Sequence, residues 1–186
     1  MARLLGTVSS SVQKSFGAFE SIATSVTTGT GVITFSSIPS TYQHLQIRIT
    51  GFGNNNSSYG RGEVRFNGDT GTNYAWHRFG GDGQNVMIND GAASQTSMKL
   101  IGRNWGFNST TAMVAIIDIH DYANTTKNKT TRSFTGHDGN AVGQSDINLA
   151  TGLWMSTAAV SSITILLDAG LYGTGTNIAL YGIKGA

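Results

Sequence analysis

The stretch GVITFSSIPSTYQHLQIRITGF, from Gly31 to Phe52, decides the fold class. In its second half Leu45, Ile47 and Ile49 alternate with polar residues. A period of two places alternate side chains on opposite faces of a strand, so this run predicts a strand with one face in a core. The apolar run VITF near the start predicts a second strand. Pro39, the only proline, has no N–H to donate to a ladder and therefore lies in the turn between the two strands.

Other short runs rich in apolar and β-branched residues recur along the chain, with turn signals about every 8–12 residues. Strands are expected at residues 19–26, 32–35, 45–50, 63–66, 74–79, 85–88, 97–101, 112–119, 130–135, 147–155, 162–167 and 177–183. Turns are expected at 89–91 and 136–140, and the aromatic segment 74–79 is compatible with a strand or a single helical turn. No window keeps a helical period, so we expect very little helix. The pattern is typical of an all-β sandwich, jelly roll or barrel.

The longest apolar run, AMVAIIDI from Ala112 to Ile119, carries hydrophobic residues on both faces. Such a run predicts a strand that is central in its sheet or covered on both sides.

The N-terminal residues 1–17 contain few apolar residues and no sustained period, so we expect an extended arm or linker there. Residues 18–186 then form one β-sandwich domain, a size that fits a single core. If the arm docks onto a partner, its apolar and basic residues are the candidate contacts. These are Arg3, Leu4, Leu5, Val12 and Phe16.

Charged residues make up only 12% of the chain, against roughly 25% in ordinary globular proteins. A weakly charged β protein more often hides surface in an assembly than stays a free monomer, because charge keeps monomers soluble and blunts sheet edges. The net charge of +2 comes from scattered basic residues, which argues against a nucleic-acid partner. No window is apolar enough for a membrane span, and no signal-peptide core follows Met1, so we expect synthesis in a cytoplasm without standard export. The chain has no cysteine, which excludes disulfides and thiolate chemistry.

One cluster of titratable residues is a weak candidate for a metal site. Asp118 and His120 share one face of a predicted strand, with Asp121 on the other, and could bind a metal together with His137 or Asp138 if the loops meet. The favoured interpretation is a strand end that becomes polar as it leaves the core.

Other chemical signatures are also weak. The segment Asn67–Asn73 superficially resembles a calcium loop but lacks the glutamate that an EF-hand needs. The two glutamates, Glu20 and Glu63, fall on separate predicted strands, and no Gly-x-Ser-x-Gly or His-Glu-x-x-His motif is present. The glycine-rich segments lack the lysine and helix of a phosphate loop. We therefore expect no enzyme activity, cofactor or metal.

Aromatic residues near predicted loops are candidates for stacking on sugar rings or for anchoring an interface. These are Trp76, Trp105 and Phe107. Most buried aromatics are instead core residues, so this alternative stays open.

Six segments spread over about residues 19–186 have a recognisable sequence. They are FESIAT, ITFSSIPSTYQHLQIRI, VRFNGDTGTNY, DIHDYANTTKNKTTRS, GLWMSTAAVSSITI and IALYGIKGA. Together they resemble segments of a group of small structural proteins of tailed bacteriophages. The resemblance implies a non-enzymatic β-sandwich that assembles on the phage particle, often as a trimer, as a capsid decoration (cement), head-fibre, tail or baseplate component. The motifs are strand and turn sequences, and the resemblance brings no active-site residues with it.

The combined expectation is an antiparallel jelly-roll-like β-sandwich with an extended N-terminal arm, acting in a virion as a capsid decoration protein. Its partners would be the major capsid protein or other virion proteins, and further copies of the chain in a homotrimer, with no nucleic acid and no membrane. The alternative is a tail or baseplate module that recognises host glycans. A polysaccharide-degrading enzyme is the least favoured hypothesis.

Overall fold

The computed structural model of the chain describes residues 17–54, 60–84, 88–102, 111–140 and 145–185, and the structural statements below concern these residues. They form twelve β-strands and no helix. The strands are β1 (Phe19–Val26), β2 (Val32–Phe35), β3 (His44–Gly51), β4 (Gly62–Phe66), β5 (Tyr74–Gly81), β6 (Ile88–Gln95), β7 (Met98–Ile101), β8 (Met113–His120), β9 (Lys129–Asp138), β10 (Ser145–Trp154), β11 (Ile163–Leu167) and β12 (Asn177–Ile183).

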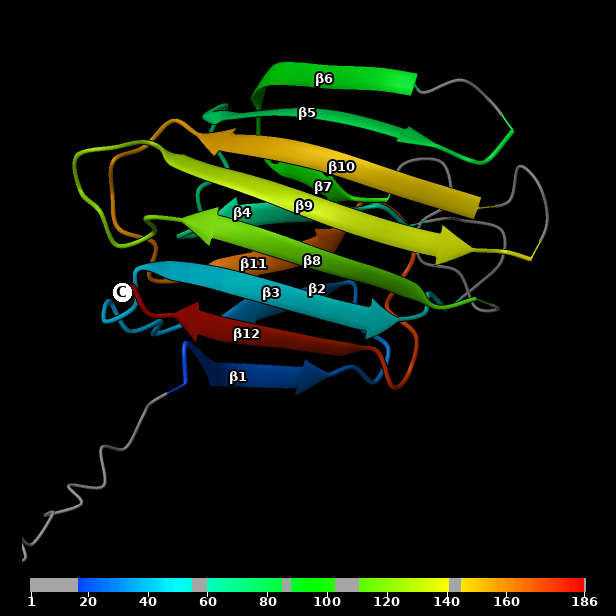
Figure 1. Cartoon of the computed structure of the whole chain (residues 1–186), viewed down its shortest axis with the longest axis horizontal. Helices are drawn as coiled ribbons and strands as arrows, with labels where there is room; N and C mark the ends of the chain where they lie inside the picture. Colours follow the sequence, from blue (N-terminus) through cyan, green and yellow to red (C-terminus); the bar gives the residue numbers. More distant parts are fainter. Residues whose placement is uncertain (1–16, 55–59, 85–87, 103–110, 141–144, 186) are drawn as a thin grey trace, which may run out of the picture.

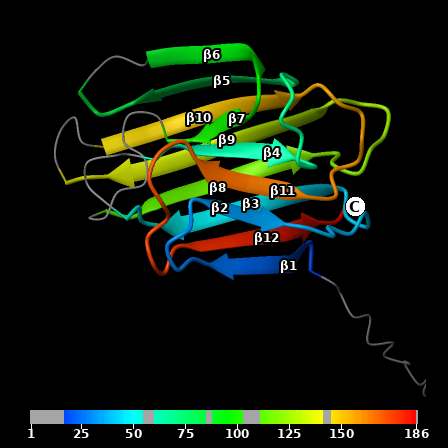
Figure 2. The ribbon, with the colours of Figure 1, turned by 180° about the vertical axis from the view of Figure 1, so that it is seen from behind.

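The strands build two antiparallel sheets that pack face to face as a β-sandwich, which confirms the predicted fold class (Figure 1). The larger sheet has eight strands in the order β1-β12-β3-β8-β9-β10-β5-β6, and the smaller has four in the order β2-β11-β4-β7. Figure 2 shows the molecule from behind, with the smaller sheet in front of the middle of the larger one. The larger sheet is therefore wider than its cover.

The stretch that decided the fold class connects the two sheets. Its first strand, β2, is an edge of the smaller sheet, and its second, β3, lies inside the larger sheet. Leu45, Ile47 and Ile49 all face the core, with exposed fractions of 0%, 0% and 2%. The turn between the strands is held by Tyr122, whose hydroxyl donates a hydrogen bond to the carbonyl oxygen of Pro39. Both predicted strands and the position of the proline are confirmed.

Strand β8 is central in the larger sheet, between β3 and β9. Its inward residues include Ile117 and Ile119, both fully buried. Its outward residues Val114 and Ile116 are 51% and 42% exposed. The prediction of a central strand is correct, and within the described chain only one of its faces is covered.

The core lies between the sheets, where β7 packs against β5, β9 and β10. The indole of Trp154 lies edge-on to Phe66 and stacked on Tyr74, with ring centroids 5.6 and 6.4 Å apart. At one end of the sandwich, the ring of Tyr42 lies directly over Gly182 of β12, where an added Cβ would meet ring carbons at 2.3–2.4 Å. A glycine is required there because the aromatic ring takes the place of a side chain.

Residues 89–91, predicted as a turn, and the first three residues of the turn predicted at 136–140 are strand instead. Residues 89–91 belong to β6, where Asp90 forms an ion pair of 2.9 Å with Arg78 of β5. Gly136–Asp138 continue β9, in which Gly136 and His137 pair with both β8 and β10 and Asp138 pairs with β10. In both segments the cross-strand partners satisfy the backbone in a strand, so the local turn preference of Asn, Asp and Gly is overridden. The aromatic segment that starts at Tyr74 is a strand, not a helical turn.

Candidate assembly surface

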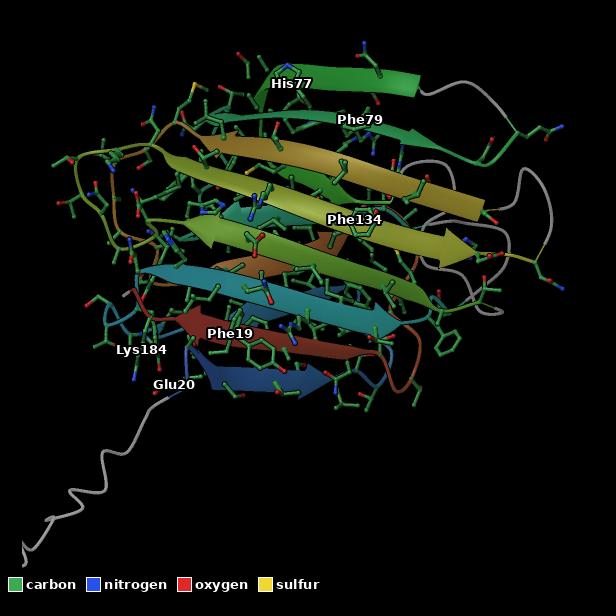
Figure 3. The ribbon with its side chains drawn as sticks, viewed as in Figure 1. Phe19, Glu20, His77, Phe79, Phe134 and Lys184 are labelled. Atoms are coloured by element: carbon green, nitrogen blue, oxygen red, sulfur yellow. The ribbon has the colours of Figure 1, made fainter. Side chains whose placement is uncertain are left out.

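The larger sheet turns one face toward the smaller sheet and the other, called here the outer face, toward the viewer in Figure 1. On the outer face a row of apolar side chains crosses four neighbouring strands in register. Phe79 of β5 pairs with Leu149 of β10, which pairs with Phe134 of β9, which pairs with Ile116 of β8. Their exposed fractions lie between 41% and 48%. We call these four residues the apolar row; Figure 3 labels two of them, Phe79 and Phe134, at its end and centre.

A second row lies beside the apolar row, one step along the strands. It contains Ile147 of β10, Gly136 of β9 and Val114 of β8, again in register. Ile147 and Val114 are 54% and 51% exposed. The glycine between them leaves a gap, because a Cβ built there would have only one neighbouring atom within 4 Å, Cγ2 of Val114 at 3.8 Å. At Gly136 the floor of the surface therefore has room for an added methyl group.

A row of polar residues borders the apolar row on the other side. Gln46 of β3 donates through Nε2 to Oδ1 of Asp118 at 2.8 Å, and Arg132 donates through Nε to Oδ2 of the same carboxylate at 3.0 Å. Arg48 donates through Nε to the side-chain oxygen of Gln46 at 2.8 Å. The guanidinium of Arg48 also lies over the rings of Phe19 and Tyr181, at 5.4 and 5.1 Å. This network links Arg48, Gln46, Asp118 and Arg132 beside the apolar row, whose side chains remain between 41% and 48% exposed.

The rows form a groove in the outer face, made of two hollows that share Phe134. The first has a volume of about 760 Å³ and is lined by His77, Arg78, Phe79, Asn89, Asp90, Ile116, Asp118, Arg132, Ser133, Phe134, Leu149, Ala150 and Thr151. The second has a volume of about 540 Å³ and is lined by Gly81, Asp82, Gly83, Ala112, Val114, Phe134, Gly136, His137, Asp138, Ser145, Asp146 and Ile147.

Among the described residues that line the groove, the outward side chains include the carboxylates of Asp118 and Asp138 and the guanidinium of Arg132. The side chains of Arg78 and Asp146 lie on the inner side of the sheet, where both residues are 6% exposed and Arg78 forms an ion pair with Asp90.

Backbone N–H donation from Asn140, followed by the Ser145 hydroxyl, holds the pKa of Asp138 below its usual value. Burial lowers the pKa of the inward-facing His137, although two nearby carboxylates oppose this shift.

The prediction that Trp76 is a surface aromatic is wrong. Its side chain faces the core with 5% exposure, and Arg78 packs over the ring with its guanidinium carbon 4.9 Å from the centroid. Trp105 and Phe107 lie outside the described residues, as do all five candidate contacts in the arm, Arg3, Leu4, Leu5, Val12 and Phe16.

The residues considered for a metal site do not converge. His120 lies opposite Thr130 at one end of β9, whereas His137 lies seven residues further along that strand, about 23 Å away at strand spacing. His120 packs edge-on against His44, with ring centroids 5.2 Å apart. Asp121 forms an ion pair of 3.1 Å with Lys127, which holds the pKa of this carboxyl below its usual value. Within the described ranges no group of three or more metal-binding side chains is present.

The loop that resembles a calcium site has a structural use for its carboxylate. Asp69 accepts hydrogen bonds from the indole N–H of Trp154 at 2.7 Å and from the backbone N–H of Gly71 at 2.8 Å. The two glutamates lie in different sheets. Glu20 pairs with Lys184, and Glu63 accepts a hydrogen bond from the hydroxyl of Ser97. Neither the Asp69 loop nor the two glutamates form a pair of carboxylates that could act together on one bond.

Comparison of the chain with models of protein families, with curated proteins and with solved structures gave no match in any of the three. In the part of the chain that the structure describes, no helix has the length and apolar character needed to cross a bilayer.

The apolar row is not predictable from the sequence pattern, because alternating apolar residues are expected to face the core. In β9 the relation is reversed. The inward residues are polar, among them Thr131 and Ser133, and the aromatic Phe134 points outward. The only signal for this reversal is that TTRSFT offers polar residues on both faces, so neither face is marked as the inner one.

Proposed function

We propose that the protein is a non-enzymatic structural component of a bacteriophage virion, a capsid decoration (cement) protein that binds and stabilises the head shell. The observation that carries this proposal is the apolar groove of the outer face. Monomeric soluble proteins rarely leave a large contiguous apolar patch uncovered, and such patches mark interaction sites. A low content of charged residues, 12%, also favours a protein whose surface is covered in an assembly.

We also propose that the sandwich is jelly-roll-like, and the order of its strands supports this. The strands β1, β12, β3 and β8 form one sheet in that order, and β2, β11, β4 and β7 form the facing sheet. Strands that follow each other in the chain, such as β1 and β2 or β3 and β4, thus fall in opposite sheets, as in the paired Greek keys of a jelly roll. The pairs β5-β6 and β9-β10 widen the larger sheet, and they carry most of the apolar row.

The proposed mechanism is mechanical. The sandwich supplies a rigid body, and contacts through the outer face and the N-terminal arm join many copies to one another and to the shell. Each contact is weak by itself, and the repetition of the contact over a particle supplies the affinity through avidity. The shell is then stabilised against the pressure of packaged DNA.

A second candidate is the tail or baseplate module that binds host glycans. The feature that favours it is the combination of Phe79 and Phe134 with the polar side chains of Asn89, Asp118 and Arg132 around one hollow. Sugars are bound by aromatic faces together with hydrogen-bonding groups. A glycan array with the wild-type protein and Phe134→Ala separates the two candidates, since binding that is lost in the variant favours the glycan module.

Immunogold electron microscopy of intact phage particles tests the proposal. Antibodies raised against the purified protein should label the heads in many copies. Label confined to tails or baseplates would favour the second candidate, and particles without label would refute a role in the virion. Disrupted particles provide the control for epitopes that are hidden in the intact virion.

A further inference from the structure

One end of the inner face of the larger sheet is polar, although it lies in the interior of the sandwich. Four inward-facing residues lie in register there, across four neighbouring strands. They are Gly80 of β5, Asn148 of β10, Thr135 of β9 and Ala115 of β8. Asn148 and Thr135 are 2% and 0% exposed, so an amide and a hydroxyl are both withdrawn from solvent.

Within the described ranges these two side chains have no hydrogen-bond partner. This holds for Nδ2 and Oδ1 of Asn148 and for Oγ1 of Thr135. The neighbouring inward residue of β9, Ser133, differs, because its hydroxyl donates to the carbonyl oxygen of Leu100 in β7. Strand β7 ends one residue later, at Ile101. Burial of an amide and a hydroxyl without hydrogen bonds is unfavourable, so we expect a ligand at this pair.

Asn148 and Thr135 are directly opposite in register, yet their side chains do not bond to each other. Residues opposite one another on antiparallel strands have Cβ atoms about 4.5–5.5 Å apart. The amide of Asn148 lies over Gly80 of β5, where a built Cβ would meet Oδ1 at 2.3 Å. The amide is therefore turned toward β5, whereas Thr135 lies on the opposite side of β10. A small molecule between the two groups can bind both of them.

The ligand of this pair has to donate and to accept hydrogen bonds, because an amide and a hydroxyl each do both. An anion would leave Oδ1 of Asn148 without a donor, and the charge of the inward-facing Arg78 nearby on β5 is already balanced by its ion pair with Asp90. A hard cation such as Ca²⁺ needs roughly six to eight oxygen ligands, far more than one amide and one hydroxyl supply. Water both donates and accepts, and a buried water typically makes about three hydrogen bonds.

We propose that Asn148 and Thr135 bind a buried water molecule between the two sheets. The water supplies the hydrogen bonding that strand β7 supplies to the neighbouring row of the inner face. Thr135 follows Phe134 in β9 and Asn148 precedes Leu149 in β10, so the site lies directly behind the centre of the apolar row. The water thus joins the two strands that carry these outward side chains. The inference does not depend on the virion role.

A high-resolution crystal structure of the full-length protein tests the proposal directly. The expected result is one density peak of a water molecule, at roughly 2.7–3.2 Å from the Asn148 amide and from Oγ1 of Thr135. Asn148→Leu and Thr135→Val replace the two polar side chains by apolar ones of similar shape. Thr131→Val is the matched control, since Thr131 is also an inward residue of β9 with 0% exposure, and its hydroxyl has a protein partner, Sδ of Met98 at 3.7 Å.

Magnetic relaxation dispersion of water counts long-lived internal waters in solution. Wild type and Thr131→Val should give the same count, and the Asn148→Leu/Thr135→Val double variant should give one fewer. Each single variant should melt about 2–8 °C below wild type, because it leaves the other polar group buried with its water incompletely bonded. The double variant should melt no lower than the single variants, because both polar groups are gone.

Three results would overturn the proposal. A crystal structure in which a protein group or an ion bonds to Asn148 and Thr135 would show that water is not their ligand. A water count unchanged in the double variant would show that these side chains hold no water. Losses in melting temperature that simply add in the double variant would show that the two side chains share no ligand. The wild-type crystal structure decides the question even where the double variant does not fold. None of these readouts requires a phage particle, so failure here is distinct from failure of the proposed function.

Discussion

Two neighbouring isoleucines of β8 provide a matched test of which face of the larger sheet is buried. Ile117 is fully buried between the sheets, where it pairs with Ile47 and Ser133, whereas Ile116 is 42% exposed on the outer face. Replacement by alanine removes the same atoms at both positions. At Ile117 it also leaves a cavity in a closed core, so the expected loss is about 3 kcal/mol of unfolding free energy.

At Ile116 no closed cavity forms, and half of the removed surface was already in water. The expected loss is about 1 kcal/mol at a protein concentration low enough to keep the chain monomeric. For a chain of this size 1 kcal/mol corresponds to roughly 2–4 °C in Tm, so the two variants should melt about 4–8 °C apart. Urea unfolding followed by circular dichroism, together with calorimetry, measures both quantities.

The comparison also depends on protein concentration. If the outer face is covered in an oligomer, the loss in Ile116→Ala should grow as the concentration rises, whereas the loss in Ile117→Ala should contain a constant core contribution. Equal losses in the two variants at low concentration would refute the assignment of inner and outer faces.

Three further predictions concern the fold. Gly182→Ala should destabilise by about 1–3 kcal/mol, because the new Cβ would meet the ring of Tyr42, whereas Gly136→Ala should be nearly neutral; calorimetry of the pair checks this. Hydrogen bonds to the Asp69 carboxylate, the largest effect coming from the indole N–H of Trp154, hold its pKa below the ordinary 3.8. The stability that this carboxylate contributes to the fold is therefore present above pH 3.8 and is lost as the pH falls through the lower pKa of the folded state. Asp69→Asn should therefore lower stability near neutral pH and flatten the decline in acid, as measured by urea unfolding at several pH values. Burial lowers the pKa of Lys129 below 10.5, so the unfolded chain binds more protons in the interval between the two values and stability should rise with pH there. Lys129→Met should abolish that rise, and a variant that keeps it would show that another group is responsible.

The fold was largely predictable from the sequence where one face of a strand is apolar. In β3, Leu45, Ile47 and Ile49 mark the inner face by themselves, and the burial of all three follows from the alternation. The apolar run of β8 correctly indicated a central strand. Local turn preferences failed at residues 89–91 and 136–138, because pairing with neighbouring strands decides the conformation of these segments.

The candidate surface was not predictable from alternation alone. Phe134 and Leu149 alternate with neighbours just as core residues do, and only the register of the four paired strands shows that they form an exposed row. Trp76 was expected at the surface because it precedes His77 near a predicted loop. Its strand turns the indole inward, and a buried arginine packs against it. Which face is inner depends on contacts with the smaller sheet, which are distant in sequence.

The central claim is that the outer face of the larger sheet is an assembly surface, and Phe134 lies at the centre of its apolar row. Sedimentation equilibrium of wild-type protein and Phe134→Asp, over a range of concentrations, tests it most directly. The wild-type chain should form a small symmetric oligomer, and the variant should be monomeric with a Tm within about 2 °C of the monomeric wild type, since the side chain is 48% exposed. A wild-type chain that stays monomeric at high concentration, or a variant that assembles equally well, would contradict the claim.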